Sequence, residues 1–119
     1  MSESPVKYSS DKLTEFKTIV QEKLKNTKEE LDGIKERQAD QKENVANTNV
    51  DFNENSKHFQ QQAKTKEHIR RLENNVAELE AAMDRIEEGT YGVSETTGEL
   101  IREERLKAMP TARFDIIPD

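Results

Sequence analysis

The residues best suited to chemistry are two carboxylates three positions apart, Asp51 and Glu54, in an Asn-rich stretch near the middle of the chain. An acid followed three residues later by Glu is the pattern of a capping box, in which both side chains accept hydrogen bonds from free backbone N–H groups at a helix start. Ser56 is an alternative cap, because Ser also favours this position. The three residues therefore predict the start of a helix that carries two negative charges.

Other reactive groups are sparse. The chain has no cysteine, so it can form neither a disulfide nor a thiolate metal site. His58 and His68 are ten residues apart, about 15 Å along a helix, which is too far for them to share a metal ion. There is no glycine-rich phosphate loop and no Ser/His/Asp set. We therefore expect a protein that is not an enzyme and that uses no cofactor and no metal.

Two series of residues predict the elements that carry these groups, because both recur at spacings of three and four, the period of a coiled-coil seam. The two series match in reverse order: residues whose numbers sum to about 103 pair apolar with apolar and polar with polar, which favours an antiparallel hairpin. The first series is Val20, Leu24, Thr27, Leu31, Ile34, Gln38, Gln41 and Val45, and the second is Phe59, Gln62, Thr65, Ile69, Leu72, Val76, Leu79, Met83 and Ile86.

The sequence thus predicts a mostly α fold in three parts. Residues 1–10 form a flexible N-terminal lead, residues 11–88 a long antiparallel coiled-coil helical hairpin with its tip at about 47–55, and residues 89–119 a small C-terminal α/β knob. Ser9 and Ser10 before Asp11 indicate the start of the first helix. Gly89 is suited to the C-terminal cap of the second helix.

The knob is too small to be stable alone, so we expect it to pack on the first helix, where Leu13, Phe16 and Ile19 make the apolar face wider than a seam. Within the knob the sequence predicts a short helix from Arg102 to Ala108 and a terminal strand around Phe114 to Ile117. A monomer and a dimer that shares the wide apolar face are both compatible with this pattern.

Composition limits the partners. The net charge is −6 and 37% of the residues are charged, values that also occur in disordered chains, but a seam mirrored over many layers favours a folded rod. An acidic chain has little general affinity for a nucleic-acid backbone, so no direct nucleic-acid binding is expected. No stretch is apolar enough to span a bilayer and the N-terminus has no secretion signal, which indicates a cytoplasmic protein without a membrane partner.

The run Tyr91–Gly98 (YGVSETTG), followed by Arg105-Leu106, Ala108 and Pro110, resembles the C-terminal zinc-finger segment of the TraR/DksA family. That family has the pattern Y/F-G-x-C-x-x-C-G…R-L-x-A-x-P…C-x-x-C. The resemblance covers the second helix and the knob. It implies a coiled-coil hairpin beside a zinc-finger-like knob in a transcription regulator that binds bacterial RNA polymerase and inserts the hairpin into the secondary channel.

All four zinc-ligand positions of that pattern are changed, and they fall on Ser94, Thr97, Asp115 and Pro118. One carboxylate does not make a zinc site, so the resemblance implies a degenerate zinc finger without zinc. We expect Asp115 to accept hydrogen bonds from Ser94, Thr97 or nearby backbone N–H groups. Apolar packing should also replace the metal, and the residues expected to supply it are Tyr91, Leu100, Leu106, Phe114 and Ile116.

The family's tip motif, D-x-x-D-x-A, falls on Asp51, Glu54 and Ser56, so the resemblance implies that these residues contact the polymerase. Their alternative role is the helix cap alone. The basic positions that serve the family's response to ppGpp fall on Glu78 and Met109, so the resemblance does not extend to that response. The expected function is a DksA-like regulator of RNA polymerase, and the alternative is a non-enzymatic coiled-coil scaffold that keeps the fold without binding polymerase.

Overall fold

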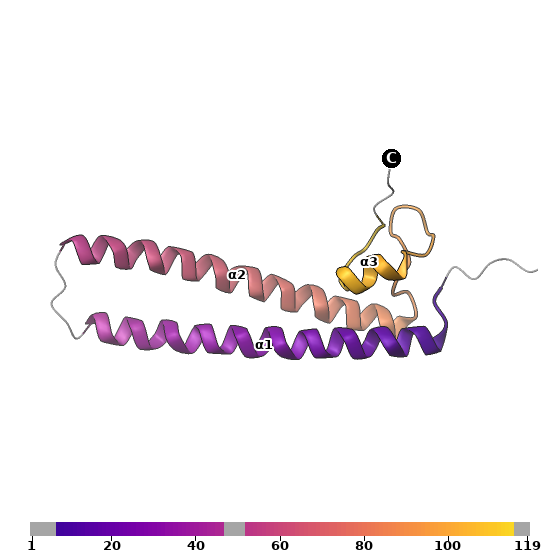
Figure 1. Cartoon of the computed structure of the whole chain (residues 1–119), viewed down its shortest axis with the longest axis horizontal. Helices are drawn as coiled ribbons and strands as arrows, with labels where there is room; N and C mark the ends of the chain where they lie inside the picture. Colours follow the sequence, from indigo (N-terminus) through magenta and orange to yellow (C-terminus); the bar gives the residue numbers. More distant parts are fainter. Residues whose placement is uncertain (1–6, 47–51, 116–119) are drawn as a thin grey trace, which may run out of the picture. The chain divides into compact units, whose positions relative to one another are not determined.

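The computed structural model describes residues 7–46 and 52–115, and the side chains of all of these except residues 41–46 and 52–56. The described residues form three helices, α1 (Ser10–Ala46), α2 (Phe52–Glu88) and α3 (Glu103–Ala108). The two long helices pack against each other with opposite chain direction (Figure 1), which confirms a mostly helical fold with a helical hairpin. The predicted centre of the tip, residues 47–51, lies outside the described residues.

Both predicted helix ends outside the tip are formed by local hydrogen bonds. At the start of α1, the backbone N–H of Lys12 donates to Ser9 Oγ at 3.3 Å, as expected for a serine cap. At the end of α2, Gly89 takes a φ of 80°. Its N–H donates to the Ile86 carbonyl, and the N–H of Thr90 donates to the Arg85 carbonyl at 2.8 Å. This is a Schellman motif, and its positive φ explains the glycine.

The chain forms two compact units, which we name the central unit (Lys25–Val76) and the terminal unit (Met1–Leu24 with Ala77–Asp119). The core of the central unit is a cluster of four buried seam residues, with Val76 packed against it. The cluster consists of Leu31, Ile34, Ile69 and Leu72. All five belong to the predicted seam.

Ion pairs that join α1 and α2 agree with the predicted antiparallel register. In the central unit, Glu30 lies 3.6 Å from His68 and Lys35 lies 3.7 Å from Glu73. In the terminal unit, Lys17 lies 3.0 Å from Glu87. The residue numbers of these pairs sum to 98, 108 and 104, which lie on both sides of the expected value of about 103.

The seam prediction is wrong at Phe59, whose side chain is 65% exposed. A seam alternates between spacings of three and four. Gln62 and Thr65 are three residues apart, so the step before Gln62 must be four residues. The preceding seam position is therefore residue 58, so Phe59 lies one residue past the stripe. The predicted partner, Val45, lies outside the described side chains.

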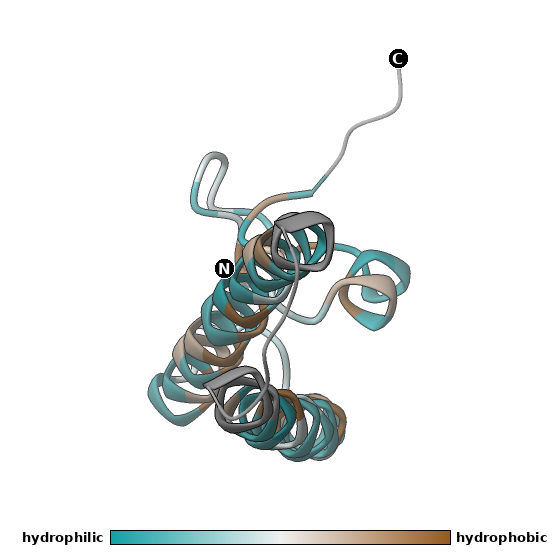
Figure 2. Cartoon of the chain, turned by 90° about the vertical axis from the view of Figure 1, so that its left-hand side faces the viewer, coloured by the Kyte–Doolittle hydropathy of each residue, from teal (hydrophilic) through white to brown (hydrophobic). Residues whose placement is uncertain are grey.

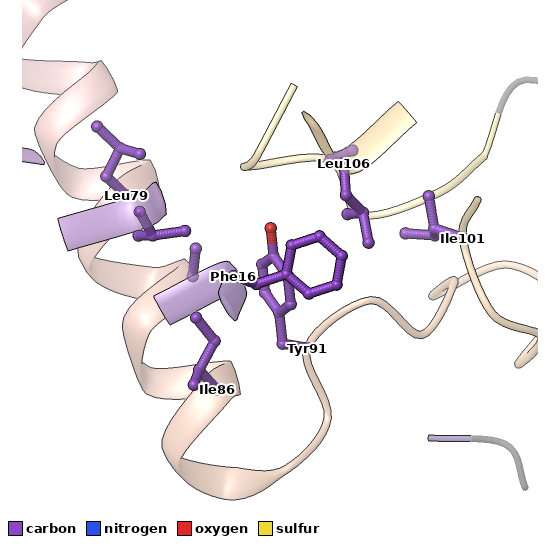
Figure 3. Packing of buried hydrophobic residues seen from close by; sticks show 9 residues of the cluster. Phe16, Leu79, Ile86, Tyr91, Ile101 and Leu106 are labelled. Carbon is purple, nitrogen blue, oxygen red and sulfur yellow. The ribbon is translucent and has the colours of Figure 1, made fainter. Parts of the chain in front are cut away.

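The terminal unit contains the larger core, and Figure 3 shows it from close by. Phe16 of α1 lies between Leu79 and Ile86 of α2 and the residues Ile101 and Leu106 of the C-terminal segment. The buried cluster comprises Phe16, Val20, Leu79, Ala82, Ile86, Tyr91, Ile101, Leu106 and Ala112. Leu13 and Ile19 are partly buried against it. The predicted packing of the C-terminal segment on this wide face of α1 is thus confirmed.

The predicted α/β character of the C-terminal segment is not shown by the described residues. Among the described residues it forms the short helix α3, as predicted, but no strand. It contains only a single antiparallel bridge, between Val93 and Leu100. Phe114 and Asp115, the described part of the predicted terminal strand, are irregular, and Phe114 is 50% exposed. A strand needs a ladder of backbone partners, whereas Asp115 is held through its side chain.

Figure 2 shows hydrophilic residues predominating along both long helices, with hydrophobic positions recurring along each. Such helices bury one stripe each and leave the remaining surface polar. In the described parts of the chain, none of the helices has a stretch that is both long and apolar enough to cross a membrane.

Candidate functional site

Ser94 and Thr97, the first two positions that the resemblance aligned with zinc ligands, lie in a tight turn organised by Ser94. Its side chain is buried, and Ser94 Oγ accepts hydrogen bonds from the backbone N–H groups of Thr96 and Thr97, both at 3.3 Å. Thr97 Oγ1 in turn accepts from the N–H of Glu99 at 3.2 Å. A serine hydroxyl that accepts from N–H groups two and three residues ahead closes a local turn without any metal.

The third position, Asp115, is held by Arg102. The backbone N–H of Arg102 donates to Asp115 Oδ2 at 3.1 Å, which confirms the expected acceptance from a nearby backbone group. The Arg102 guanidinium adds hydrogen bonds to both carboxylate oxygens at 3.0–3.2 Å. Asp115 does not point into open solvent, since its side chain is 18% exposed. The guanidinium was not anticipated, because a charged residue before a short helix gives no sequence signal of its partner.

The structure brings these positions close together through the backbone. The N–H of Glu95, inside the Ser94 turn, donates to the carbonyl of Arg113 at 2.8 Å, two residues before Asp115. Pro118, the fourth position, lies outside the described residues.

The described residues do not fit a zinc ion. Zinc sites in proteins use thiolate, imidazole or carboxylate ligands, whereas Ser94 and Thr97 offer neutral hydroxyls that already serve their own turn. The one carboxylate, Asp115, faces a guanidinium whose positive charge would repel a cation. In the part of the chain that the structure describes, no group of three or more His, Cys, Asp or Glu side chains is arranged to hold a metal ion.

Two tyrosines fasten the C-terminal segment to the rest of the terminal unit. The Tyr91 ring is fully buried, and its hydroxyl donates to the Pro110 carbonyl at 2.7 Å. Tyr8, expected to lie in the flexible N-terminal lead, donates its hydroxyl to the Ile101 carbonyl. Both tyrosine rings pack against the Phe16 ring, at centroid distances of 5.4 Å for Tyr8 and 5.3 Å for Tyr91.

Ionic contacts add to this attachment. Lys12 Nζ, near the start of α1, lies 2.8 Å from Glu103 Oε1 at the start of α3. The hydrogen bond from Lys12 lowers the pKa of Glu103. A general acid at neutral pH needs the opposite shift, so this carboxylate is suited to an ion pair rather than to proton transfer. Arg113 similarly reaches Glu78 of α2 at 3.3 Å.

The buried tyrosine predicts a loss of stability at high pH. Burial is the main cause that raises the pKa of Tyr91 to about 12 from its ordinary value of 10.0. The unfolded chain releases this proton near pH 10 while the folded chain keeps it. Titration of Tyr91 should therefore leave the free energy of unfolding independent of pH below pH 10 and should lower it by about 1.4 kcal/mol per pH unit between 10 and 12.

The measurement is urea unfolding at pH 8 to 12 on the wild type and Tyr91→Phe, followed by circular dichroism. The variant should be less stable at pH 8, because it lacks the hydrogen bond to Pro110, but its stability should fall less steeply above pH 10. Phenolate absorbance gives an independent titration, since the chain has two tyrosines and no tryptophan. Equal slopes in the two proteins would contradict the assignment to Tyr91.

The predicted tip residues are placed only in part. Asp51 lies outside the described residues, and Glu54 and Ser56 lie in α2 without described side chains. The described part of the helix begins at Phe52. The capping box and the polymerase contact both remain predictions for these residues.

In comparisons with protein families, curated proteins and solved structures, no match to the chain was found.

Proposed function

We propose that this protein is a regulator of bacterial transcription that resembles the TraR/DksA family, binds RNA polymerase and inserts its helical hairpin into the secondary channel. The observation that carries the proposal is the segment Tyr91–Pro110, whose motif residues have structural roles in the terminal unit. Tyr91 and Leu106 are fully buried in its core, and Pro110 accepts the hydrogen bond from Tyr91. The motif residues therefore belong to a packed core to which both long helices also contribute.

Hydrogen bonds and packing support a zinc-free version of the same knob. The Ser94 turn, the Asp115–Arg102 pair and the buried tyrosine join the segments that a metal would otherwise hold. A structural zinc can contribute about 10 kcal/mol or more to the folding of a small peptide. In this chain the long helices share the core with the C-terminal segment, so that segment does not have to be stable alone.

The tip supplies the proposed contact with the polymerase. As the resemblance implies, Asp51 and Glu54 would bring two carboxylates toward the active-site region of the polymerase, near its magnesium-binding groups. Their cap role does not conflict with this, since a carboxylate that accepts a backbone hydrogen bond keeps its charge.

The test is a pull-down of RNA polymerase core with the wild type and with Asp51→Asn/Glu54→Gln. We expect the wild type to bind and to compete with a known secondary-channel factor, and the tip variant to compete at least about tenfold less well, a loss of about 1.4 kcal/mol. Circular dichroism must show equal helicity, because loss of a cap alone costs about 1 kcal/mol of stability.

Glu29→Gln/Asp32→Asn is the matched control. These exposed residues of α1 are also three positions apart, and they form no ion pair within the described residues. The control removes the same two charges and should bind like the wild type. If the wild type does not bind polymerase at micromolar concentration, the resemblance is limited to the fold and the scaffold alternative is favoured. Equal losses in both variants would show that net charge, and not the tip, determines binding.

A further inference from the structure

One face of α2 carries a continuous row of hydrogen-bond donors. Lys57, Gln61, Lys64, His68 and Arg71 follow one another at spacings of four and three, so their side chains share one side of the helix. None of the five is buried, and the row extends over about 21 Å. We name these five residues the basic stripe. It contains no carboxylate, although the chain as a whole has a net charge of −6.

An open groove of about 320 Å³ runs beside the middle of this stripe, between α1 and α2 of the central unit. Arg37 contributes a cation from the α1 side. The groove lies where the predicted seam has a polar layer of Gln38 and Thr65, whose side chains fill less space than two aliphatic residues. The residues that line it are Ile34, Arg37, Gln38, Gln61, Lys64, Thr65 and His68. No carboxylate is among them.

The cations around the groove are not neutralised within the described parts of the chain. There, Arg37, Lys57, Lys64 and Arg71 form no ion pair, and His68 is the member of the stripe that lies near an acid, Glu30. This differs from other lysines of the chain, such as those that pair with Glu87, Glu73 and Glu103.

The distribution of charge along α2 also has no explanation in helix stability. The stretch 57–71 contains five Lys and Arg residues and one acid, whereas the stretch 73–88 contains six acids and one Arg. The helix macrodipole does not explain it, because its effect is limited to charges in the first and last turns of a helix, and residues 57–71 lie beyond the first turn of α2. The basic half of α2 is therefore available for an external partner.

We propose that the basic stripe and the adjoining groove bind an acidic α-helix of a partner protein. Lys57, Lys64 and Arg71 are seven residues apart, which gives a repeat of about 10.5 Å along the helix axis. A second helix that packs at a small crossing angle presents its own heptad-spaced acids at the same repeat. The groove between two helices accommodates the apolar edge of such a helix, and Ile34 provides the contact.

Two other anionic occupants fit less well. A nucleic acid presents its phosphates at a much closer spacing, and the acidic chain would repel such a polyanion. A second copy of this chain does have heptad-spaced acids, Glu73, Glu80 and Glu87. Glu73 and Glu87 are already in ion pairs, with Lys35 and Lys17, and Glu80 also has an interaction within the chain.

The test uses a labelled synthetic helical peptide with Glu at three positions seven residues apart. An isomer with the same composition places the three Glu residues on three different faces. Fluorescence anisotropy at low salt should show binding of the heptad peptide, at least about tenfold weaker binding of the isomer, and weakening with added salt. In Arg37→Glu/Lys64→Glu the heptad peptide should bind at least about tenfold more weakly than to the wild type.

Lys25→Glu/Lys66→Glu is the matched control, since both lysines are exposed and lie off the stripe. It makes the same change in net charge and should weaken binding much less than Arg37→Glu/Lys64→Glu does, because its charges lie farther from the bound peptide. Equal losses in the two double variants, equal binding of the two peptides, or no binding of the heptad peptide would overturn the proposal. Tighter binding of an RNA or DNA oligomer than of the heptad peptide would also overturn it. Self-association of the wild type in sedimentation velocity would do the same if Arg37→Glu/Lys64→Glu abolished it. The tip residues are unchanged throughout, so failure here is distinguishable from failure of polymerase binding.

Discussion

Replacing Phe16 with alanine should lower the free energy of unfolding by about 3–5 kcal/mol, the usual cost of truncating a buried aromatic side chain. Phe16 is 2% exposed and its ring contacts both tyrosine rings. It also lies between α2 and the C-terminal segment (Figure 3), so its removal opens a cavity that adjoins three parts of the chain. Since small domains have only about 5–15 kcal/mol of stability, the terminal unit of this variant should be close to unfolding.

Phe59→Ala is the matched control, because it makes the same substitution at a side chain that is 65% exposed. It should change stability by less than about 0.5 kcal/mol. Urea unfolding followed by circular dichroism reports both units, whereas tyrosine fluorescence reports the terminal unit, which contains both tyrosines. If the two substitutions had similar effects, Phe16 would not be the centre of the core.

Gly92→Ala should be the second most damaging substitution, with a cost of about 3 kcal/mol or more. Gly92 has a φ of 79°, a conformation that costs other residues about 1–2 kcal/mol. A Cβ atom there would also lie 2.6 Å from two atoms of the Tyr8 ring and 3.2 Å from Leu106. The added methyl group would displace Tyr8 and its hydrogen bond to Ile101, and this adds the cost of overpacking a core.

Substitutions at two other glycines distinguish the cost of backbone strain from the cost of the steric clash. Gly98→Ala has a similar φ of 75° but nothing within 4 Å of the new Cβ, so it should cost only the backbone strain of about 1–2 kcal/mol. Gly33→Ala, inside α1 and also unobstructed, should raise stability by about 1 kcal/mol through helix propensity. Adding Tyr8→Ala to Gly92→Ala should cost less than the sum of the two single changes. Strict additivity would contradict the predicted clash.

Contacts spread over a wide area join the C-terminal segment to the rest of the terminal unit. Tyr8 and Lys12 contact it from the N-terminal end of α1, and Arg102 links it internally through Asp115. Most of these contacts involve residues far apart in the sequence, so the stability of this unit should depend on both chain ends together.

The sequence by itself determined the two long helices, their antiparallel register and the caps at Ser9 and Gly89. These depend on short-range rules: seam periodicity, complementary layers and the backbone freedom of glycine. It also indicated that Tyr91 and Leu106 would be buried and that Leu13, Phe16 and Ile19 would receive the C-terminal segment. The helices and their register follow from a pattern within about one helical turn, repeated along the chain, whereas the burial of Tyr91 and Leu106 was expected from the resemblance.

Only the tertiary structure decided the rest of the site. Arg102 was not anticipated as the partner of Asp115, Phe114 was expected inside and is half exposed, and the predicted terminal strand is absent from the described residues. Phe59 lies outside the seam because a shift of one residue along a helix moves a side chain to a different face. In an irregular segment of about thirty residues no periodic pattern specifies the contacts, so neighbours distant in sequence, such as Tyr8 and Ile101, become apparent only once the chain is folded.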